Sequence, residues 1–465
     1  MINIESPNTY EAERRYIFGV IFGEFLGLEI NIDFTNRQNI LIKLDGNRQI
    51  VIPDRLFATP LDDWLKVGSL PQQPLQVWDL SCVNLNALTV NDRLPIVYGA
   101  DPTQSDFFDQ SETQINLGVD IFGSAFFMLT RYEEVVKPDR DRVDRFPVTA
   151  SLAYQENFLN RPIVNEYVEI LWACLVRLAP TLQRKIRKFQ IVVSHDVDEP
   201  FRYAFSDISR LIKRCAGDIY RRRSLSAAAT SIWQWLQVKS GRSDLDPCNT
   251  FDLIMDISEQ QNIKSAFYFI VDRPAGLLDC DYSIDHPLIR DLLRKIHQRG
   301  HEIGLHTSYL TYQNPTQTKQ EFDTLKRVCL EEGIEQAAWG GRQHCLRWET
   351  PTTFQNWEAA GLDYDSTLSF AELVGFRCGV CYEFSTFNLK TRKHLHLKEQ
   401  PLIVMECTVL DDRYMNLGTE DTLALECILN LKNCCKIFQG NFTLLWHNNR
   451  FTDPREVEIY KQLVN

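Results

Sequence analysis

Two acidic residues follow a short apolar run in the middle of the chain. Asp196 and Asp198 lie in Ser194-His-Asp-Val-Asp198, directly after Gln190–Val193. Alternate residues of an extended strand project to the same side, so both carboxylates can serve one site. A carboxylate together with imidazole nitrogens suits zinc, manganese, iron or cobalt, and a second carboxylate beside the metal can accept a proton from bound water. The alternative is a helix cap or a salt bridge with no chemical role.

The histidines are confined to the C-terminal part of the chain, where all nine lie at or after position 195. His306, His344 and His447 each come just beyond a predicted strand, whereas His301 begins one and is expected to be structural. The place of His306 at a strand exit favours metal binding over a role as a core histidine. A histidine on the far side of such a site could protonate a leaving group.

Alternating strands and helices must position these side chains. Apolar runs predict strands at 190–194, 264–271, 301–306, 337–339, 362–364, 402–405 and 442–446. Helical periodicity and capping residues predict helices at 286–298, 316–332, 351–360, 419–436 and from Asp453 onward. Repeated β–α units predict a parallel sheet whose carboxyl strand ends open on one face, so that residues far apart in sequence converge there.

Residues 1–185 are predicted to form a separate α/β domain. They contain no histidine and no Gly-rich phosphate loop, and they include predicted helices at 121–129 and 164–178. The boundary falls in the basic link 184–188, which leaves 186–465 as the second domain. We therefore expect no catalytic group in 1–185, and expect its deletion to affect solubility or partner binding rather than chemistry.

Composition excludes several classes of protein. The net charge of −12 argues against nucleic-acid binding, and no run of eighteen apolar residues predicts a membrane-spanning helix. Met1–Tyr16 has no apolar core of a secretory signal, and thirteen cysteines, an odd number, indicate thiols of a reducing, cytoplasmic compartment. Cys378 and Cys381 form a single CxxC, which disfavours a structural zinc. The basic stretch Arg202–Arg223 is interpreted as a solvated helix face in preference to a contact with an anionic membrane or a glycan.

Six short motifs occur in an order that resembles the polysaccharide deacetylases of the NodB-homology family. They are Ser194-His-Asp-Val-Asp198, Ala266-Phe-Tyr-Phe269, Gly300-His-Glu-Ile-Gly-Leu-His306, Arg342-Gln-His-Cys345, Tyr364-Asp-Ser-Thr367 and Leu445-Trp-His447. The resemblance covers about residues 189–450 and implies a distorted β/α-barrel of about seven strands. The preceding residues resemble the N-terminal domain that accompanies one bacterial branch of the family.

The resemblance implies a role for four of these residues at the metal. Asp196 matches the catalytic base, and Arg342 matches the arginine that orients it. Asp198 and His306 match a metal-binding aspartate and the first metal-binding histidine. The implied cofactor is a divalent metal, with zinc as the first choice.

The last two motifs imply an acid pair, and at two positions this sequence differs from the family pattern. Asp365 and His447 match an acid pair in which His447 protonates the departing amine. Leu310 stands where the family has its second metal histidine, and Cys345 stands where an aromatic residue helps to hold the oxyanion. Either His344 is the replacement ligand, or catalysis is weakened or lost.

Three functions are compatible with these residues. The first is metal-dependent removal of an N-acetyl or similar acyl group from a glycan or glycan precursor. The second is a degenerate deacetylase-fold protein that binds a glycan or an assembly partner, which the leucine at position 310 favours. The third is a two-carboxylate glycosidase, which would not need this set of histidines.

Overall fold

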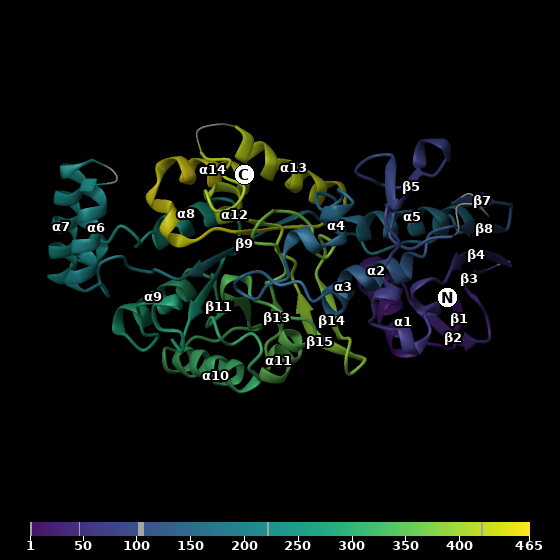
Figure 1. Cartoon of the computed structure of the whole chain (residues 1–465), viewed down its shortest axis with the longest axis horizontal. Helices are drawn as coiled ribbons and strands as arrows, with labels where there is room; N and C mark the ends of the chain where they lie inside the picture. The colour runs from purple at the N-terminus through teal and green to yellow at the C-terminus, as the bar shows by residue number, and fades with distance from the viewer. Residues whose placement is uncertain (1, 46, 101–106, 221–222, 420–421) are drawn as a thin grey trace. The chain divides into compact units, whose positions relative to one another are not determined.

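The chain is a mixed α/β protein that divides into two compact units (Figure 1). The computed structural model describes residues 2–45, 47–100, 107–220, 223–419 and 422–465. The first unit comprises residues 1–190, 346–404 and 427–443, and the second comprises 191–345, 405–426 and 444–465. Residues 346–404 and 427–443 therefore group with the N-terminal residues, which differs from a division at residue 185. The division at residue 185 remains a prediction, and so does the absence of catalytic residues from 1–185.

The first unit contains a six-stranded sheet in the order β2-β1-β3-β4-β8-β7 and a two-stranded ribbon, β5-β6. These strands are β1 (Ile2–Pro7), β2 (Ile30–Thr35), β3 (Asn39–Leu44), β4 (Arg48–Pro53), β5 (Gln76–Asp79), β6 (Arg93–Ile96), β7 (Phe108–Gln110) and β8 (Gln114–Leu117). Its helices are α1 (Glu11–Phe18), α2 (Ile121–Leu129), α3 (Tyr132–Val136), α4 (Leu152–Gln155), α5 (Ile163–Leu178), α11 (Thr352–Ala360) and most of α13 (Leu423–Ile437). It also contains β13 (Tyr364–Asp365), β14 (Phe384–Asn388) and β15 (Lys393–Glu399).

Buried charges join distant segments within the first unit. The Arg377 guanidinium and the Glu134 carboxylate form a salt bridge of 2.6 Å, and both side chains are buried. Arg131 also contacts Glu134, at 2.8 Å, and donates to the backbone carbonyl of Arg377. A buried charge that loses its partner destabilises a fold by about 3–5 kcal/mol. Residues 346–404 therefore depend on N-terminal residues for charge compensation.

A fragment of residues 186–465 is expected to be insoluble or to lack a cooperative unfolding transition. It would leave Arg377 buried without Glu134, and it would remove the helices that pack in the same unit. Expression of the fragment followed by circular-dichroism melting measures this, and co-expression of 1–185 as a separate chain serves as the control. A soluble monomeric fragment with a sharp melting transition would contradict the prediction.

The second unit is built on parallel strands. Its strands are β9 (Gln190–Val197), β10 (Ala266–Ile270), β11 (Glu302–Thr307) and β12 (Gly340–Gln343), and β10 pairs in parallel with both β9 and β11, which in turn pairs with β12. All five residues of β10 are buried, as expected of a parallel strand that is covered on both faces. Its helices are α6 (Ile208–Tyr220), α7 (Leu225–Lys239), α8 (Phe251–Gln260), α9 (Pro287–Gln298), α10 (Pro315–Glu331), α12 (Glu406–Leu410) and α14 (Pro454–Val464).

The complete sheet has nine strands, in the order β14-β15-β13-β12-β11-β10-β9-β17-β16. The last two are β17 (Asn441–Leu445) and β16 (Val404–Met405). The expected count of about seven strands is therefore not confirmed. The register sets Asp196 beside Tyr268, and His306 beside both Ile270 and Arg342, so the polar residues of β9, β11 and β12 lie at the same edge.

Gly341 allows β12 to approach β11 closely. A Cβ atom at position 341 would lie 1.8 Å from the carbonyl oxygen of Leu305, a backbone atom that cannot give way. Two successive glycines, Gly340 and Gly341, therefore form a strand despite their low strand propensity. The close pairing places Arg342 and His344 next to His306.

Candidate active site

Three side chains meet at the carboxyl edge of the parallel strands: Asp198 directly follows β9, His306 lies in β11, and His344 directly follows β12. One ligand atom each from Asp198, His306 and His344 lies within 4.8 Å of the others. Asp198 Oδ1 is 3.3 Å from His306 Nε2, and Asp198 Oδ2 is 3.9 Å from His344 Nε2. Donors bound tetrahedrally to zinc at 2.0–2.1 Å are separated by about 3.3 Å. The two distances from Asp198 end on its two different oxygens, so the three groups would hold one zinc ion once their side chains move closer together.

His306 is oriented by its other ring nitrogen. Its Nδ1 donates to the backbone carbonyl of Arg342 at 2.9 Å, which leaves Nε2 as the atom that faces Asp198. A backbone acceptor on the outer nitrogen is the usual way to fix the tautomer of a metal-binding histidine. Asp198 Oδ1 is buried and makes no hydrogen bond among the described residues, so it is available as a ligand atom.

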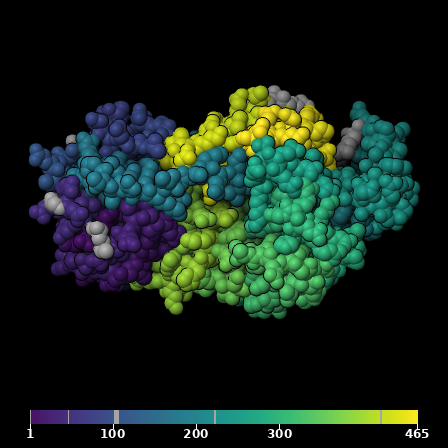
Figure 2. Space-filling view, turned by 180° about the vertical axis from the view of Figure 1, so that it is seen from behind, coloured from purple at the N-terminus to yellow at the C-terminus, as the bar shows by residue number. Residues whose placement is uncertain are grey.

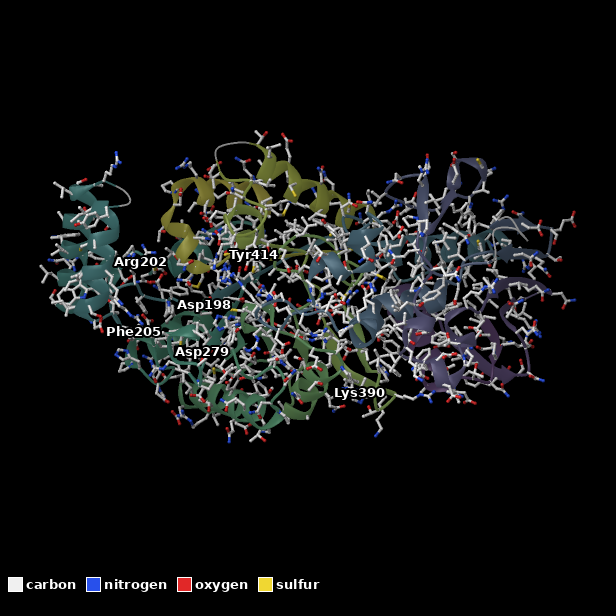
Figure 3. All side chains as sticks on the ribbon, in the orientation of Figure 1. Asp198, Arg202, Phe205, Asp279, Lys390 and Tyr414 are labelled. Atoms are coloured by element: carbon white, nitrogen blue, oxygen red, sulfur yellow. The ribbon has the colours of Figure 1, made fainter. Side chains whose placement is uncertain are left out.

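Asp279 supports His344 at its other ring nitrogen, Nδ1, and no local pattern predicts a role for this aspartate. Asp279 Oδ1 lies 3.7 Å from His344 Nδ1, and its two oxygens accept backbone N–H groups from Tyr309 at 2.6 Å and Ala275 at 2.8 Å. In Figure 3 the labelled Asp198 and Asp279 lie on neighbouring parts of the second unit. Burial lowers the pKa of His344, but the two carboxylates outweigh burial and hold that pKa well above its usual value. The only sequence signal was an aspartate in the loop after a predicted strand.

The same cluster of imidazoles acts on Asp198. Burial favours the protonated carboxyl group, but the neighbouring His344, His306 and His447 outweigh it and hold the pKa of Asp198 well below its usual value. The side chain is one-third exposed. Asp198 is therefore a carboxylate over the whole physiological range, as a metal ligand must be.

Asp196 and Arg342 form a buried pair next to these ligands. Arg342 Nη1 donates to Asp196 Oδ1 at 2.7 Å, and Nη2 donates to Ser194 Oγ at 2.9 Å. The other carboxylate oxygen of Asp196 lies 3.6 Å from His306 Nε2. Arg342 thus fixes one oxygen of Asp196, and the second oxygen faces the candidate metal position.

His447 and Glu406 form a second pair beside Asp198, in which Glu406 is buried and His447 is partly exposed. His447 Nδ1 is 2.5 Å from Glu406 Oε1, and its Nε2 is 3.7 Å from Asp198 Oδ2. Burial lowers the pKa of His447, but the carboxylate of Glu406 outweighs it and raises that pKa well above the usual value. The pKa of Glu406 moves downward, because the adjacent imidazole outweighs the effect of burial. His447 is therefore held as an imidazolium that can donate a proton.

Glu406 is a residue that the sequence reasoning missed. It follows the short strand β16 directly, which is the same signal that identified the other site residues. The predicted partner of His447 was Asp365, which lies in β13 of the first unit, where its carboxylate accepts a hydrogen bond from Thr367. The catalytic role of Asp365 remains a prediction.

Replacing Glu406 by Gln is expected to move the alkaline limb of the pH–activity profile to lower pH by about 1–2 units. A general acid must be protonated, so activity falls as pH rises through the pKa of His447. Without the Glu406 carboxylate that pKa drops, and the fall begins at lower pH. The profile of kcat/KM against pH measures the shift. Glu458→Gln, an exposed glutamate on α14, is the matched control, and an unmoved limb in Glu406→Gln would contradict the pairing.

The two departures from the expected pattern have distinct locations. Leu310 is 51% exposed, so the position at which a second metal histidine was sought lies at the surface. Cys345 is exposed and adopts a positive φ of 58°. His301 is outside the metal cluster and accepts a hydrogen bond from the backbone N–H of Ser265 at 3.2 Å, as a structural histidine would.

Residues 2–180 match a family described as a family of unknown function, DUF7033. No curated protein matches the sequence.

Three solved structures are similar to the chain over 60% of its length. A Mycobacterium smegmatis protein described as a polysaccharide deacetylase is 14% identical, with 83% of its own chain covered and a TM-score of 0.38. Puue allantoinase is 11% identical, with 83% covered and a TM-score of 0.33. A Pseudomonas aeruginosa PAO1 protein described as a polysaccharide deacetylase is 13% identical, with 84% covered and a TM-score of 0.34. Similarities this low do not identify the function of the chain.

Within the part of the chain that the structure describes, no helix is both long enough and apolar enough to cross a membrane.

Proposed function

We propose that this protein is a metal-dependent hydrolase that removes an N-acyl group from a glycan or glycan precursor. The observation that supports this most is the convergence of Asp198, His306 and His344 within 4.8 Å. A buried carboxylate–arginine pair lies beside His306, and a histidine–glutamate pair lies beside Asp198. This set provides a metal site, a base and an acid, which are the three functions that amide hydrolysis requires.

Asp198, His306 and His344 would hold the metal, and zinc is our first choice because of its preference for nitrogen and carboxylate ligands. When bound, the metal would polarise the acyl carbonyl and increase the acidity of water. The fit rests on the donor separations and on the buried, otherwise unbonded Asp198 Oδ1.

Proton transfers would be carried by two residues next to the proposed ligands, Asp196 beside His306 and His447 beside Asp198. The free oxygen of Asp196 accepts the proton of the attacking water, while Arg342 keeps the carboxylate in place through the 2.7 Å hydrogen bond. His447, held as an imidazolium by Glu406, donates its proton to the departing amine. An amine leaves readily only when it is protonated, so the raised pKa of His447 serves this step.

A glycan as substrate is the extension that the six sequence motifs support. Hydrolysis of a different amide would use the same acid, base and metal. The degenerate binding protein remains the competing function, and the distances from Asp198 to His344 and to His306 are the observations that disfavour it.

Metal removal tests the proposal directly. Protein purified without chelator is expected to contain about one equivalent of divalent metal and to release acetate from N-acetylated oligosaccharides. Dialysis against a chelator should abolish acetate release, and added zinc should restore it. Protein that never retains metal and releases no acetate would favour the binding protein, and acetate release that survives complete metal removal would exclude the metal-dependent mechanism.

A further inference from the structure

Helices α6 and α7 form an antiparallel hairpin between β9 and α8. Ser231 Oγ donates to Asp218 Oδ2 at 3.0 Å, and Cys215 Sγ contacts the carbonyl of Ala228 at 3.8 Å. The hairpin stands out from the rest of the second unit in Figure 1 and in Figure 2. Its own core is small and consists of Tyr203, Leu211 and Val238, with partly buried residues packed against them. Much of the surface of both helices is therefore left uncovered.

Each helix carries an exposed apolar stripe. The exposed large apolar residues are Ile208, Ile212, Ile219 and Tyr220 on α6, and Leu225, Ile232, Trp233 and Leu236 on α7. Ile208 is 62% exposed and Leu225 is 74% exposed. At 100° per residue, the three isoleucines of α6 fall within about 40° of one another, and so do Leu225, Ile232 and Leu236 of α7.

The two stripes lie on one face of the hairpin. On α6, the stripe is rotated by about 90° about the helix axis from the buried face, which contains Leu211 and Asp218. On α7, the stripe is rotated in the same sense by about 110° from the buried face, which contains Ala228, Ser231 and Val238. In an antiparallel pair, offsets of the same sense point to the same side. The hairpin therefore presents one broad apolar face.

The hairpin is also strongly basic within an acidic protein. Residues 208–239 contain seven Lys or Arg and one Asp, which gives 7 − 1 = +6, whereas the whole chain carries −12. The single acid, Asp218, is buried. Near the start of α6 is a hollow of about 370 Å³. Its lining residues include the acidic Glu199 and the basic Arg202, Arg210, Lys213 and Arg214.

We propose that this hairpin docks the protein on an anionic lipid membrane. Helices with apolar residues on one face and Lys and Arg on the polar face lie in the headgroup region of membranes, and anionic lipids attract basic residues. The apolar stripe would enter the headgroup boundary, and Arg223 and Lys239, near the two ends of α7, would reach lipid phosphates. Arg210 and Arg214 lie on the opposite face of α6 and contact Asp281 and Glu199. A solvated helix face would not expose a row of large apolar residues. We therefore interpret this basic stretch as a membrane contact.

Charge also argues against a second copy of the chain as the occupant. Pairing two hairpins through the same face would bring two segments of +6 together, and like charges at an interface oppose association. An anionic surface gains from the same charges. Two measurements therefore distinguish a membrane from a second copy of the chain: the dependence of binding on lipid charge, and the oligomeric state of the protein.

Sedimentation of the full-length protein with vesicles tests the proposal. Binding is expected to phosphatidylcholine vesicles that contain phosphatidylglycerol, and to weaken at high salt and on vesicles of phosphatidylcholine alone. The double variant Trp233→Ser/Leu236→Ser should bind at least about tenfold more weakly, because it removes apolar surface. Lys213→Gln/Arg223→Gln should also lose about tenfold through its lost charge.

Matched controls use residues outside the hairpin. Leu330→Ser, at a 70% exposed leucine on α10, and Lys264→Gln should bind vesicles like the unchanged protein. Unchanged melting curves confirm that each variant is folded. The proposal is overturned if the unchanged protein does not bind anionic vesicles, or if the folded hairpin variants bind as well as the controls. It is also overturned if the protein is a dimer that Trp233→Ser/Leu236→Ser converts to a monomer.

Discussion

Asp196→Asn is expected to lower kcat for acyl release by about 10²–10⁴-fold while the metal stays bound. Asparagine can still accept a hydrogen bond from Arg342, but it cannot accept the proton of the attacking water. Asp196 lies beside the proposed ligands, and it faces His306 Nε2 at 3.6 Å with the oxygen that Arg342 does not fix. Metal analysis and acetate release on the same preparation separate the two effects.

Asp198→Asn should behave differently, because it replaces the one carboxylate among the three donors and so should lose metal together with activity. Asp256→Asn, on the exposed face of α8, is the matched control and should change neither quantity. If Asp196→Asn and Asp198→Asn gave the same metal content, the assignment of base and ligand would be wrong.

His344→Ala is expected to weaken metal binding by more than about 100-fold and to abolish acyl release with it. Two protein donors leave most of the coordination sphere to water, whereas three donors with an open position are usual for a hydrolytic metal. Asp279→Asn should weaken binding by about 10–100-fold, since Asp279 only orients His344. Titration of the metal-free protein with zinc measures both effects.

His297→Ala on α9 is the control for loss of a histidine, and it should bind zinc like the unchanged protein. Retained metal and activity in His344→Ala would show that His344 is structural and that the rebuilt site does not exist. The protein would then be better described as a binding protein.

Local sequence patterns predicted helices and strands correctly where the conformational preference of the residues agrees with their place in the tertiary structure. The apolar helix expected at 121–129 is α2, and the helix expected at 286–298 is α9, which begins at Pro287. The strand expected at 337–339 forms at Gly340–Gln343 instead. Glycine is a poor strand former, and the reason that it is required here, the close approach to Leu305, exists only after β11 is in place.

The candidate site divides in the same way. Asp198, His306 and His344 were found from their positions after strands, and the structure brings them together. Glu406 and Asp279 were missed because their importance comes from the histidines that they contact, and no local pattern encodes a contact between residues 406 and 447. The hairpin of α6 and α7 was missed as a unit because its buried face is narrow and its apolar exposed face resembles an ordinary core stripe.

The interleaving of the first unit has a consequence for synthesis of the protein. Glu134 and Arg377, which share a buried salt bridge, are separated by 243 residues. At about 5–20 residues per second, Arg377 leaves the ribosome roughly 12–50 seconds after Glu134. During that interval Glu134 has Arg131 as its salt-bridge partner but lacks Arg377, and the N-terminal residues leave apolar surface exposed. The first unit can be completed only after residues 427–443 have been made, so we expect the nascent protein to bind chaperones before then.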